Sequence, residues 1–153
     1  MEKKKSIDLQ DILDMWKEDS VIPEFELDEC SRHTPSLHAK YLEIRSQTKL
    51  RLKQEEMSQK SLLKEKWLWF NGKMHEDEMR DREWSFDPLE GNKVLKGDMD
   101  YYYDADPDIQ KSERLITYYK TMIDTLDEII NNLKWRHSTI KNMIDWRRFE
   151  AGG

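Results

Sequence analysis

Apolar side chains recur with a period of seven along the last part of the chain, residues 106–153. This stretch opens with Asp106-Pro107, a carboxylate that can cap a helix and a proline at the first helical position. It closes with Gly152-Gly153, a common helix stop, and no Gly or Pro lies between. We therefore predict one helix of about 65 Å, at a rise of about 1.5 Å per residue. Its apolar positions form three columns: Tyr119, Leu126, Leu133 and Ile140; Met122, Ile129 and Met143; and Ile116, Ile123, Ile130 and Ile144.

Three apolar columns make a wider stripe than the two-column seam of a coiled coil, so this helix needs several neighbours. Only 37% of the residues are hydrophobic and 38% are charged, which leaves little apolar surface elsewhere. We expect copies of the helix to pack together in a homo-oligomer. The alternative is a monomeric bundle in which the rest of the chain folds back on the helix. The oligomer hypothesis assigns these side chains to oligomerisation: Tyr119, Met122, Leu126, Ile129, Leu133, Ile140 and Phe149.

A short amphipathic helix is predicted near the start of the chain, over residues 6–19, with Ser6 as its cap. Pro23 prevents its continuation, and residues 20–33 read as a loop. We expect this acidic helix to pack on its own protein; binding to a basic partner is the alternative. The apolar face consists of Leu9, Ile12, Leu13 and Trp16.

A second long helix is expected from about Ser36 to Phe70, because Thr34-Pro35 repeats the cap-then-proline pair and Asn71-Gly72 breaks the helix. Residues 74–105 are acidic and read as a loop with a short extended piece at Val94–Leu95. The predicted fold is all-α: two long helices plus a short N-terminal helix, with the C-terminal helices assembling a ring-like homo-oligomer. The single domain has four parts: an acidic helix and loop (1–33), a basic helix (34–73), an acidic loop (74–105) and the oligomerisation helix (106–153).

The charge is distributed unevenly, which changes the interpretation of the net charge of −6. Residues 32–73 hold ten basic and four acidic side chains, a net charge of +6. The segments on either side, 1–31 and 74–110, carry −6 and −8. Because local charge decides which partners are attracted, a nucleic-acid partner is compatible with an acidic chain.

Lysines alternate with aromatic residues at the end of the basic segment. Single-stranded nucleic acid is held by such pairs, with ammonium groups along the phosphates and aromatic faces under the bases. The alternative is that the aromatic side chains belong to the core and the lysines form a solvated rim. The candidate nucleic-acid-binding residues are Lys60, Lys64, Lys66, Trp67, Trp69 and Lys73.

Enzyme signatures are missing from the sequence, so we expect no enzyme, no cofactor and no metal site. There is no phosphate-binding GxxxxGK or GxGxxG motif, and Cys30 with His33 lacks the second pair that a zinc site needs. The alternation at Asp104, Asp106 and Asp108 lacks the glycine and closing glutamate of a calcium loop. The single cysteine and the absence of a signal peptide or membrane span predict a soluble, cytoplasmic protein.

Two motifs of the sequence carry a resemblance to a known family. The more specific one is IKNMIDWRRFEAG at residues 140–152, with Ile140, Lys141, Asp145, Arg147, Phe149, Glu150, Ala151 and Gly152 as its matching positions. A second, less specific motif falls on Leu63, Lys64, Lys66, Trp69, Phe70, Asn71, Gly72 and Lys73. These motifs resemble those of the UvsY family, the recombination mediators of large tailed phages, the first of them at the end of these proteins. The resemblance spans about residues 37–152. Lys66 stands where the family usually has Arg, which loses the bidentate fork to phosphate, and Glu65 adds a negative charge.

The resemblance implies a non-enzymatic protein that forms rings of six or seven subunits and binds single-stranded DNA without sequence preference. It also implies two protein partners, a RecA-like recombinase and a single-stranded-DNA-binding protein, and loading of the first onto strands covered by the second in phage recombination, repair and replication. By the same resemblance, Lys64 and Lys66 contribute to DNA binding. The alternative is a helical oligomeric scaffold that binds only proteins.

Overall fold

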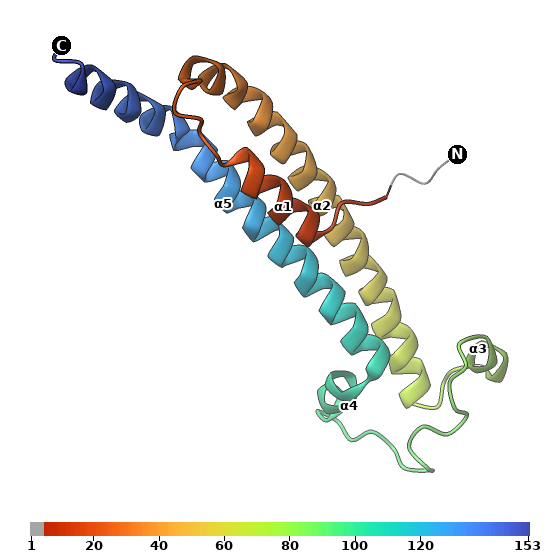
Figure 1. Ribbon diagram of the computed structural model, residues 1–153. Helices are drawn as coiled ribbons and strands as arrows, with labels where there is room; N and C mark the ends of the chain where they lie inside the picture. Colours follow the sequence, from red (N-terminus) through yellow and green to blue (C-terminus); the bar gives the residue numbers. More distant parts are fainter. Residues whose placement is uncertain (1–4) are drawn as a thin grey trace. The chain divides into compact units, whose positions relative to one another are not determined.

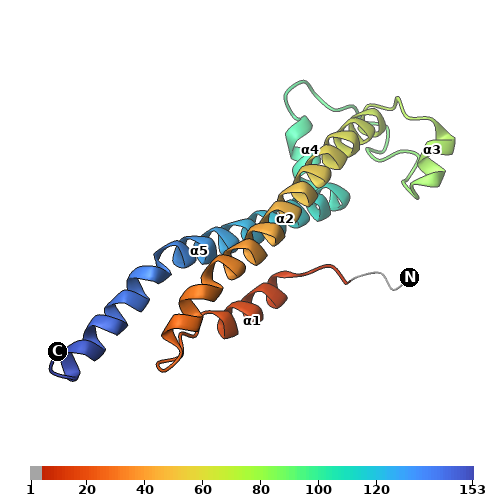
Figure 2. The same ribbon diagram turned by 90° about the horizontal axis from the view of Figure 1, so that it is seen from above.

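The chain is described from Lys5 to Gly153 by a computed structural model, which is all-helical (Figures 1 and 2). No strand occurs within residues 5–153. The chain divides into two compact units: the described residues up to Leu50 together with Tyr119–Gly153, and Arg51–Tyr118. We call these the first and the second unit. The helices are α1 (Leu9–Asp19), α2 (Leu27–Phe70), α3 (Glu76–Asp81), α4 (Met99–Ala105) and α5 (Pro107–Glu150).

Helix α1 begins later than the sequence suggested, because Asp8 and not Ser6 is its cap. The Asp8 carboxylate accepts a hydrogen bond from the Asp11 amide at 2.8 Å, and the Asp11 carboxylate accepts one from the Asp8 amide at 3.0 Å. This reciprocal pair is a capping box, which satisfies two amides that have no partner inside the helix. Ile12, one residue after the capping box, is fully buried in the core.

Helix α2 begins at Leu27, about nine residues before the predicted start at Ser36, and Pro35 lies inside it. The hydroxyl of Thr34 donates to the carbonyl of Cys30 at 3.0 Å within the helix and does not act as a cap. A proline inside a helix removes one backbone hydrogen bond. The helical turns before Pro35 compensate for this lost hydrogen bond by burying apolar surface, because Leu27 and Cys30 pack against Ile140 of α5.

The core of the first unit contains most of the columns that the sequence assigned to an oligomer interface. Ile12 of α1 and Tyr41 and Ile44 of α2 pack against α5, and Figures 1 and 2 show α1 lying along both long helices in this unit. The same chain therefore supplies the apolar partners that we expected from other copies. The α5 side chains covered in this way are Met122, Leu126, Ile129, Ile130 and Leu133, with Tyr119 packed at the edge; Ile140 lies in the neighbouring cluster with Leu27.

A polar cluster joins α1 to α2 beside this core. The Asp19 carboxylate accepts hydrogen bonds from Lys40 Nζ and Tyr41 Oη, both at 2.7 Å. Burial opposes ionisation of Asp19, but these two bonds and the charges of Lys40 and Arg136 lower its pKa. Burial, followed by the bond to Asp19, raises the pKa of Tyr41. The hydroxyl therefore stays protonated and remains a donor.

The acidic segment 74–105, predicted as a loop, contains two short helices in the second unit. His75 caps α3, and Met79 of α3 is buried. Helix α4 ends at Ala105, one residue before the cap of α5. Val94 and Leu95, predicted as a short extended piece, lie outside any helix or strand. Within residues 5–153, none of the helices combines the length and apolarity needed to cross a bilayer.

Candidate nucleic-acid interface

One face of α2 in the second unit carries exposed lysines and an aromatic ring. Lys53, Lys60, Lys64 and Trp67 are separated by seven, four and three residues, spacings that return to the same side of a helix. All four side chains are exposed, Trp67 by 40% of its surface. Lys73 follows the helix, and its ammonium lies 4.6 Å from the centre of the Trp67 ring. We call Lys53, Lys60, Lys64, Trp67 and Lys73 the lysine face.

The lysine face is free of carboxylate partners in the described part of the chain. None of the ion pairs formed by residues 5–153 involves Lys53, Lys60, Lys64 or Lys73. Glu65, which the sequence suggested would oppose binding, accepts a hydrogen bond from Arg82 Nη2 at 2.6 Å and is thereby paired. The positive charges of this face are thus available to an external anion.

Lys66 lies on a different side of the helix and is buried. We expected it at the surface, and the structure corrects this by placing it inside the second unit. Its side chain is 2% exposed, and its Nζ lies 2.9 Å from Asp106 Oδ2 and 2.8 Å from Asp108 Oδ2. The ammonium also lies 3.8 Å and 4.5 Å from the ring centres of Trp84 and Trp69. Two carboxylates and two indoles therefore fill the space that phosphate would need.

Trp69 shares this internal role, because it connects α2 to the segment that follows α3. Its indole Nε1 donates to the carbonyl of Ser85 at 2.8 Å. Its ring packs 5.1 Å from that of Trp84 and 4.9 Å from that of Phe70. Trp84 Nε1 in turn donates to Asp108 at 3.0 Å. Of the six predicted residues, the structure brings together Lys60, Lys64, Trp67 and Lys73 on one surface and places Lys66 and Trp69 behind it.

Asp108 is held in its ionised form by its neighbours. The hydrogen bond from Lys66 lowers the pKa of Asp108; burial opposes this shift, and the charge of Lys66, the bond from Trp84 and the charge of Lys111 add to it. Asp106 has a second task, since its Oδ1 accepts the amides of Asp108 and Ile109, both at 3.0 Å. The end of α2 and the start of α5 are therefore joined through Lys66.

Sequence reasoning missed Lys53 and the pairing of Glu65. A signal for Lys53 was present, because it precedes Lys60 by seven residues, about two helical turns. Arg82 lies seventeen residues after Glu65 and beyond a helix break, so no local spacing could have indicated that pair.

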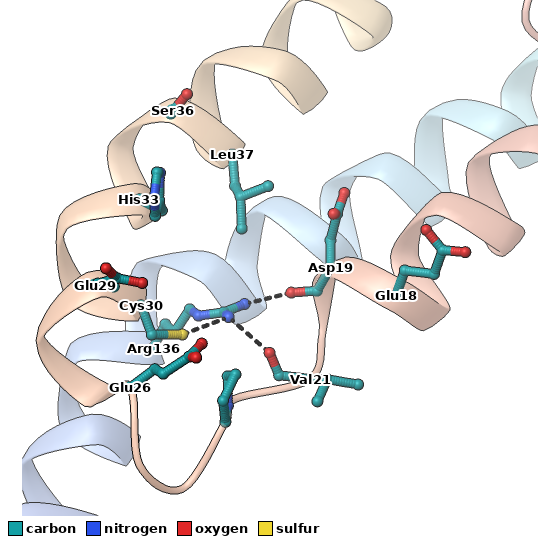
Figure 3. Close-up of a pocket in the computed structure, with 11 residues that line it drawn as sticks. Glu18, Asp19, Val21, Glu26, Glu29, Cys30, His33, Ser36, Leu37 and Arg136 are labelled. Atoms are coloured by element: carbon teal, nitrogen blue, oxygen red, sulfur yellow. Dashed lines mark hydrogen bonds between the residues drawn. The ribbon is translucent and has the colours of Figure 1, made fainter.

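Arg136 occupies the position between Ile129 and Met143 in one of the apolar columns of α5, and the structure explains why a charged side chain stands there. Its guanidinium crosses from α5 and donates to the carbonyls of Asp19 and Val21 at 2.7 Å and 3.2 Å, and to Cys30 Sγ at 3.0 Å (Figure 3). This arginine thus ties the α1–α2 connection to α5 beside a pocket of about 290 Å³. Cys30 and His33 both line that pocket, and the described residues contain no cluster of three potential metal ligands.

Exposed aromatic side chains gather near the end of α5 in the first unit. Trp135, Trp146 and Phe149 are each more than 60% exposed, and the last two stack with their ring centres 5.5 Å apart. Trp146 follows Trp135 by eleven residues and Phe149 follows Trp146 by three, so the three side chains lie on one side of the helix. Of the predicted oligomerisation residues, Phe149 alone is on this surface.

Comparison with known proteins identifies relatives along nearly the whole chain. Residues 15–153 match the profile of a family described as "Recombination, repair and ssDNA binding protein UvsY". The recombination protein uvsY of Enterobacteria phage T4 is 27% identical over 144 residues, which cover 94% of this chain and 98% of that protein.

The fold is shared with solved structures as well. A crystal structure of the bacteriophage T4 recombination mediator protein UvsY matches with a TM-score of 0.79 at 25% identity, covering 95% of this chain and 98% of that one. The same protein in another crystal lattice matches with a TM-score of 0.80 at 23% identity, covering 94% and 99%.

Proposed function

Because the chain belongs to the UvsY family of recombination, repair and single-stranded-DNA-binding proteins, we propose that it acts as a recombination mediator whose lysine face holds the unpaired strand. In this role it loads a RecA-like recombinase onto strands that are covered by a single-stranded-DNA-binding protein. The observation that supports the proposal most directly is a row of ammonium groups that pair with no carboxylate of residues 5–153 and lie beside an exposed indole. The row consists of Lys53, Lys60, Lys64 and Lys73, and the indole is that of Trp67.

The lysine face suits a single strand for two physical reasons. Ammonium groups spaced along a helix meet successive phosphates and release condensed counterions. The exposed ring of Trp67 offers a flat surface on which any base can stack, which makes binding tolerant of sequence. Four lysines in one chain support only weak binding, so tight binding requires several copies.

Assembly into a ring supplies those copies in our proposal. The columns on α5 that the sequence assigned to oligomerisation are covered by α1 and α2, so the interface between copies moves to the exposed aromatic surface of Trp135, Trp146 and Phe149. The stacked, exposed rings of Trp146 and Phe149 form an apolar patch, and such a patch commonly marks an interaction site. Linking several lysine faces raises the effective concentration of each for a strand already bound at another.

Loading of the recombinase follows from this arrangement. A strand that is held at many weak sites can be released from the single-stranded-DNA-binding protein in steps and transferred to the recombinase in steps. No single interaction has to be broken against a large barrier. Lys66 then acts through the structure, by holding the start of α5 and Trp84 behind the face, and does not contact phosphate.

The test is fluorescence anisotropy with a labelled thymidine homopolymer at several salt concentrations. Lys60→Ala combined with Lys64→Ala should weaken binding and reduce the salt slope by about 1.4, at ~0.7 for each phosphate that no longer meets an ammonium group. The matched control removes two exposed lysines from α5, Lys120→Ala with Lys134→Ala, and should leave the slope unchanged. Equal slopes in all three proteins would remove Lys60 and Lys64 from the site. No binding by the unaltered protein at low salt would favour the protein-only scaffold.

A further inference from the structure

A pocket of about 410 Å³ lies at the end of α2 in the second unit, and Gly72 of its lining directly precedes Lys73 of the lysine face in the chain. Trp69 and Phe70 of α2 form its aromatic wall, and Phe86 lines it from the segment after α3. The polar lining includes the amides of Asn71 and Asn92. This volume is at the lower end of the range for small-molecule sites, so it suits one flat ring system.

The loop that borders the pocket is held in place before any ligand arrives. Asp87 Oδ1 accepts the amide of Gly91 at 3.0 Å, and the carbonyl of Leu89 accepts both the backbone amide and the side-chain amide of Asn92, each at 3.0 Å. Gly91 has a φ of +80°, a conformation that glycine adopts without strain. The first wall is fixed as well, since Trp69 donates to Ser85. A preformed pocket loses little entropy when it is filled.

The charges around the pocket favour a neutral ligand. Residues 74–110 carry a net charge of −8, which repels phosphate. The lining itself has one carboxylate, Asp87, and one ammonium, Lys93, so that its own charges cancel. Asn71 belongs to the pocket lining and follows Trp67 by four residues, on the same side of the chain as the lysine face. A strand can thus keep its phosphates on the lysines while one uncharged group turns into the pocket.

We propose that this pocket receives a single nucleobase of the bound strand, stacked against Phe86 and the Trp69–Phe70 wall. The inference rests on the proposed function, because it needs a strand on the lysine face. Bases removed from a stack are held in this way elsewhere, between aromatic or apolar side chains with polar groups at the base edge. The oxygen atoms of Asn92 and Asp87 are acceptors for N–H groups at a base edge, such as the ring N3–H of thymine. The pocket would place one base per subunit at a defined point of the strand.

The test compares two labelled strands of the same length: a thymidine homopolymer, and a strand in which every nucleotide is abasic. Phe86→Ala should weaken binding of the homopolymer about fivefold or more, the effect expected when one base loses its stacking partner, and should leave binding of the abasic strand unchanged. Phe86 is 56% exposed, so the fold should tolerate this change, which circular dichroism checks. The control is Leu95→Ala, which removes another exposed apolar side chain from the same segment outside the pocket, and both affinities should stay as they were.

The outcomes separate the pocket from the proposed function. If Phe86→Ala weakens both strands equally, or neither, the pocket does not hold a base although the strand still binds. If the unaltered protein binds neither strand, the proposed function fails and the pocket fails with it. Photocrosslinking of the unaltered protein to a strand that contains 5-iodouracil needs no variant. Crosslinks at Phe86, Trp69 or Phe70 are expected, and crosslinks confined to Trp67 would overturn the inference.

Discussion

Lys66 Nζ lies 2.9 Å from Asp106 Oδ2, and both side chains are almost completely buried. Asp106 is also the residue that caps α5 through its Oδ1. The Asp106 carboxylate therefore accepts hydrogen bonds from the amides at the start of α5 and also pairs with Lys66. Among the described residues, Lys66 is the only lysine of α2 that is buried. This relationship explains why a lysine inside a basic, DNA-binding-like motif is not on the surface, and it leads to the first prediction.

Lys66→Met should destabilise the protein by about 3–5 kcal/mol, because it leaves the buried carboxylate of Asp106 without its partner. Urea unfolding followed by tryptophan fluorescence measures the loss of stability, since Trp69 and Trp84 lie against the ammonium. Lys64→Met is the matched control at an exposed position and should change stability by less than about 0.5 kcal/mol. Similar small effects of both substitutions would show that the pair contributes little.

The second prediction concerns stability in acid and follows from Asp108. Its pKa is lowered in the folded chain from an ordinary value of 3.8, so the unfolded chain binds more protons in the window between the two pKa values. Stability in this window rises with pH. The contribution of Asp108 is therefore complete above its ordinary pKa and is lost as the pH falls through the lowered one.

Asp108→Asn removes this titration, so its thermal midpoint should fall less steeply than that of the unaltered protein as the pH drops below about 4. Thermal unfolding by circular dichroism across this window measures both curves. The effect should be small, because the Asp108 side chain is half exposed and solvent screens its charge. Parallel curves would contradict the assignment of acid sensitivity to this carboxylate.

Leu126 should behave as a core residue of a single chain. It is fully buried among α1, α2 and α5, so Leu126→Ala should cost about 2–5 kcal/mol of folding free energy. Urea unfolding at several protein concentrations measures this change, and its size should not depend on concentration. A destabilisation that shrinks as the protein is concentrated would place Leu126 at an interface between copies instead.

The exposed aromatic surface on α5 should behave in the opposite way. Trp146→Ala combined with Phe149→Ala removes two stacked, exposed rings, so the helix content by circular dichroism should be retained. We expect the mass of the assembly measured by light scattering to fall, because the proposed interface between copies is removed. The comparison protein is Leu50→Ala, which removes an exposed apolar side chain from α2 in the same unit and should keep the mass. An unchanged mass in the double variant would exclude this surface as the interface.

Much of the fold could be read from spacing along the chain. The period of the apolar columns predicts a long helix between Asp106-Pro107 and Gly152-Gly153, and α5 occupies Pro107–Glu150. The all-helical class and the family are confirmed. These properties depend on neighbours a few residues apart, which is the range over which helix caps, glycine breaks and sequence motifs act.

Which side of each helix is buried could not be read in the same way. Lys64 and Lys66 are two residues apart and look alike in the sequence, but they point to different sides of α2. Lys66 is buried because Asp106 and Asp108, forty or more residues away, arrive beside it. Leu126 likewise finds its partners in Ile12 and Tyr41 of the same chain. Interactions between residues so far apart in the chain arise only when the helices pack. This packing determines which lysines stay exposed and could meet a strand. It also determines which apolar side chains stay exposed and could meet another copy.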